Sequence, residues 1–339
     1  MNGWDRTAAV VGGGSWGTAL AIHLARAGFW VPLWAHDPER VEEMRASREN
    51  RTYLPDFPLP ARIEPSADLE KVVEGKSLIL WVVPARYCRD LFSRVAAVLH
   101  PGARLVIATK GIEPDTGLRM SQVLGQCLGR EPKTLAALAG PGFAREVARG
   151  DPTAGVLGCN DPVEGERIQE ALSHGPYRFY TNRDLIGVEL GGALKNIIAV
   201  AAGVVEGLGY GSNTTAALMT RGLSEITRLG VACGGSPSTF AGLAGMGDLV
   251  MTCTGRLSRN RSVGVQLGQG KPISEIVNGM KMVAEGIPTT SAALLLAQRH
   301  GVELPITAGV KALLDGRVTA SEVLAGLMRR PLKGEDAWE

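Results

Sequence analysis

Cysteine is scarce in this sequence, and its spacing matches neither a disulfide framework nor a metal site. Only five cysteines occur in 339 residues, namely Cys88, Cys127, Cys159, Cys233 and Cys253. Their number is odd, and no two of them form a Cys-x-x-Cys pair. We therefore expect no disulfide framework and no metal site, and the pattern fits a reducing compartment.

A strong charge of one sign, a leader segment and a long hydrophobic run are missing too. The formal net charge is +2, which gives no overall field that attracts nucleic acid or a membrane. The first residues, MNGWDRTAAV, lack the basic and then apolar segments of a signal peptide. Between Lys195 and Glu206 lie only ten uncharged residues, whereas a membrane span needs ~20. We expect a cytoplasmic protein that binds neither nucleic acid nor membrane.

What the sequence does contain begins with a glycine-rich loop. Residues 7–11 (TAAVV) predict a short buried strand, and Gly12, Gly14 and Gly17 follow it in the spacing Gly-x-Gly-x-x-Gly. Residues 18–27 then predict a helix. Such a motif alone is weak evidence, because glycine-rich turns are common. Between a strand and a helix it predicts a dinucleotide site, in which the N-terminal end of the helix faces the phosphates.

The residues after the second expected strand (30–35) bear on the choice of cofactor. His36, Asp37 and Arg40 stand there. An acidic residue at this place favours NAD, and a cationic one accommodates the extra phosphate of NADP. Asp37 precedes a proline, so it also fits a purely structural helix cap. We expect His36 and Arg40 to accept the phosphate of NADP, with NAD tolerated.

Alternating strands and helices continue to about residue 183. Further strands are expected at 77–83, 104–109, 135–139, 154–157 and 177–180. Strand signals then fade, and long helical stretches rich in Ala, Leu and Gly follow. The fold class is α/β: an N-terminal Rossmann domain with a doubly wound sheet (1–183), followed by an all-helical domain (184–330) and a charged tail (331–339).

One long helix stands out in the second half. Residues 187–211 are mostly apolar or small, and within them Lys195 and Asn196 stand side by side. Gly191 and Gly192 lie one turn below Lys195 on the same helix face. The glycines leave room for close approach beneath the lysine. A tight helix crossing with a lysine that reaches outward explains the pattern equally well.

Three further segments carry polar residues in an apolar context. Asp248 ends a glycine-rich stretch, the sequence Ser258-Arg259-Asn260 follows shortly after, and Glu285 precedes a new helix. Each also has an ordinary structural explanation, as a helix cap or a solvated surface.

Taken together in this order, the motifs resemble those of the bacterial NAD(P)-dependent glycerol-3-phosphate dehydrogenase family. The resemblance covers nearly the whole chain and rests on GGGSWG, ATKG, GPGFAREV, ELGGALKNIIA, GLAGMGDLVMTCT, SRNR and VAEG. It implies reversible hydride transfer between NAD(P)H and dihydroxyacetone phosphate, giving sn-glycerol 3-phosphate for phospholipid synthesis. It also implies small-molecule partners. A homodimer is expected too.

The resemblance implies a role for each matching residue. Lys195 would be the proton acceptor in the oxidative direction. The cofactor would contact Gly12, Gly14, Ser15, Trp16, Gly17, His36, Tyr53, Lys110, Ala144, Arg259, Val283 and Glu285. The substrate would contact Lys110, Gly140, Gly142, Lys195, Asp248, Ser258, Arg259 and Asn260. Gly142 departs from the family, which often carries a hydroxyl or amide side chain there.

Lys195 acts as a base near neutral pH only if its pKa is lowered. Burial and nearby cations, for which Lys110 and Arg259 are candidates, lower an amine's pKa, whereas a close Asp248 raises it. We therefore expect Asp248 to hold the substrate or Lys195 in place. Two rival functions remain at this stage: a related two-domain β-hydroxyacid or 6-phosphogluconate dehydrogenase, and a nucleotide sensor without catalysis.

Overall fold

The computed structural model describes residues 6–129, 134–280, 282–332 and 334. The chain divides into two compact units. We call them the sheet unit (Met1–Thr109 and Met120–Leu185) and the helical unit (Lys110–Arg119 and Ile186–Glu339). Of the expected charged tail, residues 333 and 335–339 lie outside the described residues.

The sheet unit is built on one sheet, which has eight strands within the described residues. In spatial order they are β5 (Ile63–Ser66), β2 (Val31–Trp34), β1 (Ala8–Val11), β6 (Leu78–Trp81), β7 (Arg104–Ile107), β8 (Leu135–Ala139), β9 (Thr153–Gly158) and β10 (Tyr177–Asn182). The first six follow the Rossmann order 3-2-1-4-5-6. β1 and β6 are buried along their whole length, as expected of parallel strands covered on both faces.

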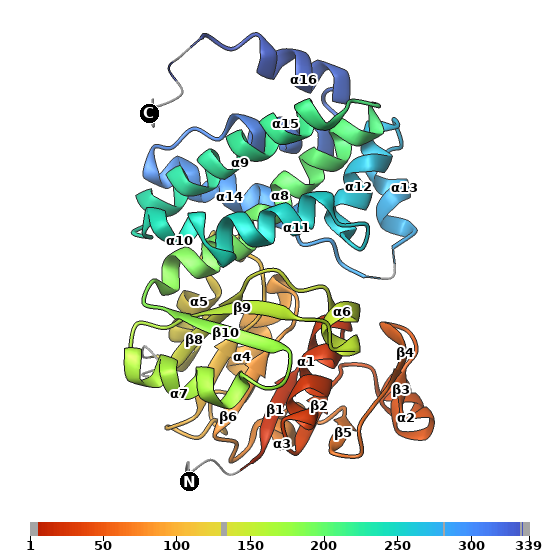
Figure 1. Cartoon of the computed structure of the whole chain (residues 1–339), viewed down its shortest axis with the longest axis vertical. Coiled ribbons are helices and arrows are strands. Elements are labelled where there is room, and N and C mark those ends of the chain that lie inside the picture. The colour runs from red at the N-terminus through yellow and green to blue at the C-terminus, as the bar shows by residue number, and fades with distance from the viewer. Residues whose placement is uncertain (1–5, 130–133, 281, 333, 335–339) are drawn as a thin grey trace. The chain divides into compact units, whose positions relative to one another are not determined.

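Helices and a small hairpin complete the sheet unit (Figure 1). They are α1 (Ser15–Arg26), α2 (Pro38–Ser47), the hairpin β3 (Glu49–Asn50) and β4 (Leu54–Pro58), α3 (Leu69–Val73), η1 (Ala85–Tyr87), α4 (Cys88–Val95), α5 (Met120–Leu128), α6 (Ala144–Arg149) and α7 (Pro162–Leu172). The predicted cap at Asp37 is confirmed, because its carboxylate accepts the backbone N–H groups of Glu39 and Arg40. Pro38 is then the first residue of α2, where its fixed φ suits a helix.

One strand pair differs from a purely parallel sheet. β8 and β9 pair in antiparallel fashion, whereas the other neighbours in this sheet are parallel. The chain between them makes only the short helix α6 and turns back at Gly150, whose φ is +95°. This short connection brings β9 back beside β8 instead of crossing over the sheet.

The helical unit packs nine helices and one π-helical turn among its described residues (Figure 1). They are α8 (Leu185–Gly207), α9 (Ser212–Ala232), α10 (Pro237–Ala241), η2 (Leu243–Gly247), α11 (Asp248–Thr254), α12 (Arg259–Gly268), α13 (Ile273–Asn278), α14 (Gly286–His300), α15 (Pro305–Leu314) and α16 (Ala320–Met328). Within the described ranges, α8 is the one helix long and apolar enough to cross a membrane, but 94% of its most apolar window is buried inside the protein. It is therefore the core helix of this unit.

α8 and α12 touch backbone to backbone. A Cβ atom added at Gly203 would lie 2.0 Å from the carbonyl oxygen of Arg261, and one at Gly264 would lie 2.0 Å from that of Val200. Any side chain at either position would force the helices apart. The tight crossing expected of this glycine-rich helix is present, more than a turn beyond Lys195.

The segment Lys110–Arg119 follows the last residues of the β7 region but belongs to the helical unit. The Asn196 side chain donates to the Lys110 carbonyl at 3.1 Å, and Arg119 pairs with Glu189. Arg299 of α14 donates to the Thr116 carbonyl at 2.5 Å. A single boundary near residue 184, as the sequence suggests, would assign this segment to the sheet unit. Its contacts place it in the helical unit instead. Its place depends on contacts with residues far away in the chain.

Candidate active site

The glycine-rich loop of the sheet unit lies where the strand order reverses, between β1 and β6. Gly12 has a φ of +126°, which a residue with a side chain rarely adopts, and an added Cβ would lie 2.7 Å from the Val82 carbonyl oxygen after β6. Doubly wound sheets bind their ligands at this crevice, outside the carboxyl ends of the strands.

The other two glycines of the motif meet different surroundings. A Cβ at Gly17 would lie 1.9 Å from the Gly12 carbonyl oxygen, so Gly17 packs α1 onto the loop. A Cβ at Gly14 would meet no atom of the described residues within 4 Å. The loop therefore leaves open space at its middle glycine, where a pyrophosphate approaches the backbone. The residues fit a dinucleotide, with the N-terminal end of α1 directed at its phosphates.

We expect Gly14→Ala and Gly17→Ala to separate binding from folding. The first adds a methyl group to open space, so the variant should keep the wild-type melting temperature but bind NADPH at least tenfold more weakly. The second forces a clash with backbone and should lower the melting temperature by several degrees or prevent folding. Thermal unfolding and NADPH fluorescence titration measure the two effects. Equal NADPH affinity for Gly14→Ala and wild type would contradict the assignment of this loop.

A buried asparagine that the sequence does not single out holds the loop in place. The Asn50 side chain donates to the Gly13 carbonyl and to the Thr18 hydroxyl, both at 2.8 Å, and accepts the N–H of Tyr53. The Ser15 hydroxyl in turn donates to the Tyr53 carbonyl at 2.5 Å. Tyr53 and Ser15, both expected at the cofactor, are thereby fixed to one loop. Asn50 lacks a motif around it, so only the fold reveals its role.

Three of the residues near the expected ribose site form a compact group. The Arg40 guanidinium lies 4.5 Å from the centre of the Tyr53 ring and 3.3 Å from the Asp37 carboxylate. Stacking on the ring and pairing with the carboxylate hold Arg40 in one orientation. His36 is exposed, two residues after the end of β2. Asp37 thus has a structural role, as helix cap and as partner of Arg40.

The remaining predicted residues of the sheet unit lie between the end of β8 and the start of α6. A Cβ at Gly142 would approach the Trp16 ring to 3.1 Å, so the ring takes the place of a side chain at position 142. Ala144 begins α6 and packs with Trp16 against the same core cluster. Gly140, with a φ of +107°, makes the turn after β8.

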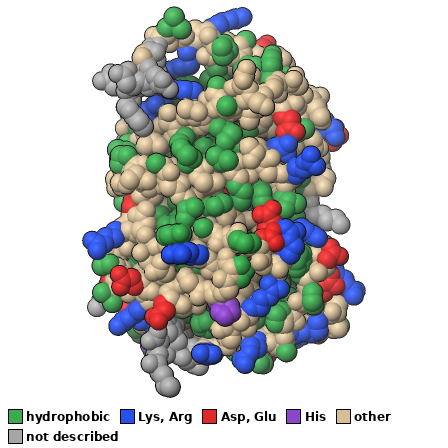
Figure 2. All heavy atoms as spheres, viewed as in Figure 1, with side chains coloured by type: hydrophobic (Ala, Val, Ile, Leu, Met, Phe, Trp, Pro, Cys, Tyr) green, Lys and Arg blue, Asp and Glu red, His purple; other side chains and the backbone are tan. Residues whose placement is uncertain are grey.

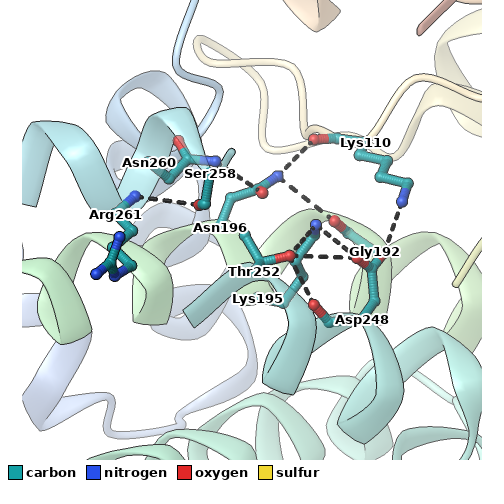
Figure 3. Close-up of polar contacts among 9 residues, drawn as sticks. All are labelled: Lys110, Gly192, Lys195, Asn196, Asp248, Thr252, Ser258, Asn260 and Arg261. Atoms are coloured by element: carbon teal, nitrogen blue, oxygen red, sulfur yellow. Dashed lines mark hydrogen bonds and ion pairs between the residues drawn. The ribbon is translucent and has the colours of Figure 1, made fainter. Parts of the chain in front are cut away.

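In the helical unit, Lys195 lies in a buried polar cluster (Figure 3). Its Nζ donates to Asp248 Oδ1 and to Thr252 Oγ1, both at 2.7 Å. The other carboxylate oxygen, Asp248 Oδ2, accepts from Lys110 Nζ at 2.7 Å. Asp248 is fully buried, and the side chains of Lys195 and Lys110 are 6% and 16% exposed. Two ammonium groups share one carboxylate, so with all three charged the cluster carries one net positive charge.

The position of Asp248 depends on a glycine below Lys195. A Cβ at Gly191 would lie 2.7 Å from the Ala244 carbonyl oxygen, so the π-helical turn η2 packs directly on α8. Asp248 follows this turn and begins α11. Thr252, one turn later, also donates to the Asp248 carbonyl at 2.6 Å. The glycine pair suggests a close approach beneath Lys195, and this approach brings the Asp248 carboxylate within hydrogen-bond distance of the Lys195 amine.

The electrostatics of the cluster prepare Lys195 to exchange a proton. The pKa of its amine is lowered to about 8: burial, the largest cause, lowers it, the Asp248 carboxylate raises it and the Lys110 charge lowers it. Burial alone would raise the pKa of the Asp248 carboxyl, but Lys110 and Lys195 outweigh it and the pKa is lowered. Asp248 stays ionised, and Lys195 is poised close to neutral pH.

The other predicted residues of the helical unit lie at the start of α12 and just before α14. Ser258 caps this helix, because its hydroxyl accepts the N–H of Arg261 at 3.2 Å. Arg259 is the first residue of α12, and its side chain is exposed. Glu285, next to Val283 and just before α14, acts electrostatically on the Arg259 guanidinium. A cation at a helix N-terminus forms an anion site, because backbone N–H groups add to its charge.

Comparison with known proteins agrees with this geometry. Two family descriptions match: "NAD-dependent glycerol-3-phosphate dehydrogenase N-terminus" over residues 7–164 and its C-terminus counterpart over residues 184–325. Glycerol-3-phosphate dehydrogenase (NAD(P)+) of Citrifermentans bemidjiense is 52% identical over 328 residues, which are 96% of this chain and 98% of that protein.

Two solved structures separate the family from the wider fold. Glycerol-3-phosphate dehydrogenase of Coxiella burnetii has a TM-score of 0.91 at 39% identity, covering 96% of this chain and 99% of that one. A PanE/ApbA family ketopantoate reductase of Ralstonia eutropha, at 17% identity, covers 94% of this chain and 99% of that one with a TM-score of 0.61, and so shares the fold alone. The chain belongs to the NAD-dependent glycerol-3-phosphate dehydrogenase family.

Proposed function

We propose that this chain transfers a hydride reversibly between NAD(P)H and dihydroxyacetone phosphate, giving sn-glycerol 3-phosphate. The observation that carries the proposal is the buried Lys195 amine, held on Asp248 beside Lys110 and with a pKa of about 8. Together with a dinucleotide loop in the other unit, this cluster meets the needs of alcohol–ketone chemistry. A bound nicotinamide supplies or accepts the hydride at the carbon.

The residues of the chain handle the proton and the charge on oxygen. As an ammonium, Lys195 donates a proton to the ketone oxygen during reduction, and as a neutral amine it accepts the hydroxyl proton during oxidation. The net positive charge of the cluster stabilises the alkoxide that develops in either direction. Asp248 keeps both lysines in fixed places, and Thr252 fixes the direction of the Lys195 amine.

Arg259 and the first turn of α12 are proposed to bind the substrate phosphate. A guanidinium offers paired N–H donors that match phosphate oxygens. We expect Arg259→Ala to raise the KM for dihydroxyacetone phosphate by roughly 10²-fold while kcat falls far less, since a charge-assisted bond contributes about 1.5–3 kcal/mol. Arg259→Lys should recover only part of the loss. Initial-rate kinetics decide, and an unchanged KM in Arg259→Ala rules out the phosphate role.

Arg40 and His36 are proposed to prefer NADP, with NAD tolerated. Arg40 is already oriented by Tyr53 and Asp37, as a site for the 2′-phosphate requires. Arg40→Ala should therefore raise the KM for NADPH about tenfold or more and leave that for NADH nearly unchanged. Kinetics with both cofactors measure the ratio. An equal effect on the two cofactors would contradict a contact with the 2′-phosphate.

Three further properties complete the proposal. All five cysteines are free thiols, which supports a cytoplasmic enzyme, and the product is a precursor for glycerophospholipids. Exposed apolar side chains of the helical unit, among them Val231, Met246 and Val250, support a homodimer. Figure 2 shows apolar side chains grouped on the visible face of this unit and charges of both signs elsewhere.

A substrate panel tests the function itself. Oxidation of NADPH and NADH is followed with dihydroxyacetone phosphate, with β-ketoacids and, in reverse, with 6-phosphogluconate. We expect turnover with dihydroxyacetone phosphate to exceed the others by at least 10²-fold. A preference for a β-hydroxyacid pair or 6-phosphogluconate would support the rival dehydrogenase, and no turnover with any substrate would support a nucleotide sensor.

A further inference from the structure

The segment Lys110–Arg119 folds back on itself within the helical unit. Its residues Ile112 and Arg119 form an antiparallel bridge. Inside this bridge, the Glu113 N–H donates to the Leu118 carbonyl at 2.9 Å. Arg119 therefore lies opposite Ile112, two residues after Lys110, although Arg119 comes nine positions after Lys110 in the sequence. We call this closed segment the lysine loop.

Two residues on one face of α8 hold the lysine loop. The Asn196 side chain donates to the Lys110 carbonyl at 3.1 Å, and it accepts in turn from Asn260 Nδ2 at 2.9 Å (Figure 3). Further along α8, the Glu189 carboxylate accepts from the Arg119 guanidinium. Glu189 and Asn196 are seven positions apart, which is about two helical turns, so they share one face of the helix. The lysine loop therefore lies along α8 with an anchor near each of its ends.

The anchor between Arg119 and Glu189 is shielded from solvent. The two side chains are only 14% and 7% exposed. Either charge would be poorly solvated there without its partner, so the pair holds together more firmly than an ion pair on the surface. Ile112, opposite Arg119, is buried in the hydrophobic core of the helical unit. The loop is thus fixed to α8 and to the core at the place where it closes.

The lysine loop carries the second cation of the buried cluster. The Lys110 ammonium shares the Asp248 carboxylate with Lys195. A lysine stem of four carbons is flexible, so the ammonium keeps one place only if the backbone beneath it is fixed. We infer that Arg119 and Glu189 are positioning residues, whose buried ion pair closes the lysine loop on α8 and thereby fixes the Lys110 ammonium beside Lys195. The effect of this pair on turnover rests on the proposed function.

Loosening the lysine loop should change the proton affinity of Lys195. Burial is the largest cause of the lowered pKa of Lys195; Asp248 and Cys253 raise this pKa, and Lys110 lowers it. When the Lys110 ammonium leaves its place, a like charge is removed and the pKa of Lys195 rises. Oxidation needs the neutral amine, so its pH midpoint should move above the wild-type value near 8. This direction is opposite to the one expected for Asp248→Asn.

Two variants that break the pair separate position from charge. Glu189→Gln removes a negative charge and Arg119→Met removes a positive one, but both release the lysine loop. We expect each variant to raise the midpoint of kcat for sn-glycerol 3-phosphate oxidation by about half a pH unit or more. Each should also lower the maximal kcat by roughly tenfold or more, since small displacements of reacting groups cost that much. If the charges acted on Lys195 directly, Glu189→Gln would lower the midpoint and Arg119→Met would raise it, and such opposite shifts would overturn the inference.

Matched controls guard against general damage and misfolding. Glu303→Gln makes the same exchange at an exposed pair with Arg330 and should leave kcat and the midpoint unchanged. Arg119→Lys keeps a cation opposite Glu189 and should recover most of the activity that Arg119→Met loses. Glu189→Asp, which shortens the side chain, serves if the other variants do not fold, and should raise the midpoint by a smaller amount. A wild-type midpoint in the variants that fold would overturn the inference. Failure of all of them to fold would overturn it too, because the pair would then serve the fold alone.

Hydrogen exchange gives a readout that is independent of activity. The Glu113 and Gly117 amides donate to carbonyls inside the lysine loop. They should exchange at least roughly tenfold faster in Glu189→Gln and Arg119→Met than in wild type, and at the wild-type rate in Glu303→Gln. If wild type does not reduce dihydroxyacetone phosphate but exchange still responds, the function fails and the anchoring of the loop stands. If wild type is active and neither exchange nor the pH midpoint responds, the anchoring fails and the function stands.

Discussion

Lys195→Ala is expected to lower kcat by roughly 10²- to 10⁴-fold in both directions, the usual contribution of a positioned acid or base. The variant lacks the amine that exchanges the proton, whereas the Asp248 carboxylate keeps its contacts with Lys110 and Thr252. NADPH affinity should change little, because the glycine-rich loop belongs to the sheet unit. Stopped-flow rates and fluorescence titration measure the two quantities.

Two further variants control for lost packing and for lost charge. Lys195→Met keeps most of the buried side-chain volume and should be as inactive as the alanine variant. Lys311→Ala removes a surface lysine of α15 that pairs with Asp315, and it should leave kcat unchanged. Turnover within a few-fold of wild type in Lys195→Met would remove this amine from the chemistry.

Asp248→Asn is expected to shift the pH profile as well as lower the rate. In wild type, oxidation should rise with pH through about 8, because the reacting amine must be neutral, and reduction should fall above about 8, because it needs the ammonium. The Asp248 carboxylate raises the pKa of Lys195, whereas burial and Lys110 lower it. Without the carboxylate the amine's pKa falls, so the variant's profile should move to lower pH. Reduction at pH 7 should drop by roughly tenfold or more.

The pH dependence of kcat in both directions checks this expectation. Asp315→Asn changes an exposed carboxylate of the same unit and should leave the profile where it is in wild type. A midpoint that stays near 8, or one that moves to higher pH, in Asp248→Asn would show that the titrating group is not the lysine paired with this aspartate.

Much of the sheet unit follows from local sequence signals. The strand, glycine motif and helix at its start are adjacent in the chain, and a Gly-x-Gly-x-x-Gly spacing has one well-known geometry. Asp37 followed by Pro38 marks a helix start for equally local reasons. The antiparallel pairing of β8 with β9 is different, since no residue pattern distinguishes a parallel from an antiparallel buried strand. The role of Asn50 could not be predicted from the sequence either, because its hydrogen-bond partners are 32 and 37 residues away.

The proposed site shows the same contrast. Lys195 stands out in an apolar helix, and the glycines below it correctly suggest a close neighbour. The partners of its amine lie 53 and 57 residues later, and Lys110 lies 138 residues from Asp248, so spacing alone cannot join them. Thr252 resembles any threonine on a helix until the fold places it on Lys195. The resemblance to a family names Asp248 and Lys110, but only the structure shows that Lys110 and Lys195 share the Asp248 carboxylate.

A crystal structure with NADP+ and sn-glycerol 3-phosphate tests the central claim most directly. The account predicts that Lys195 Nζ lies within hydrogen-bond distance of the C2 oxygen, with the phosphate at Arg259 and the first turn of α12. A C2 oxygen far from this nitrogen, with no water molecule between them, would contradict it.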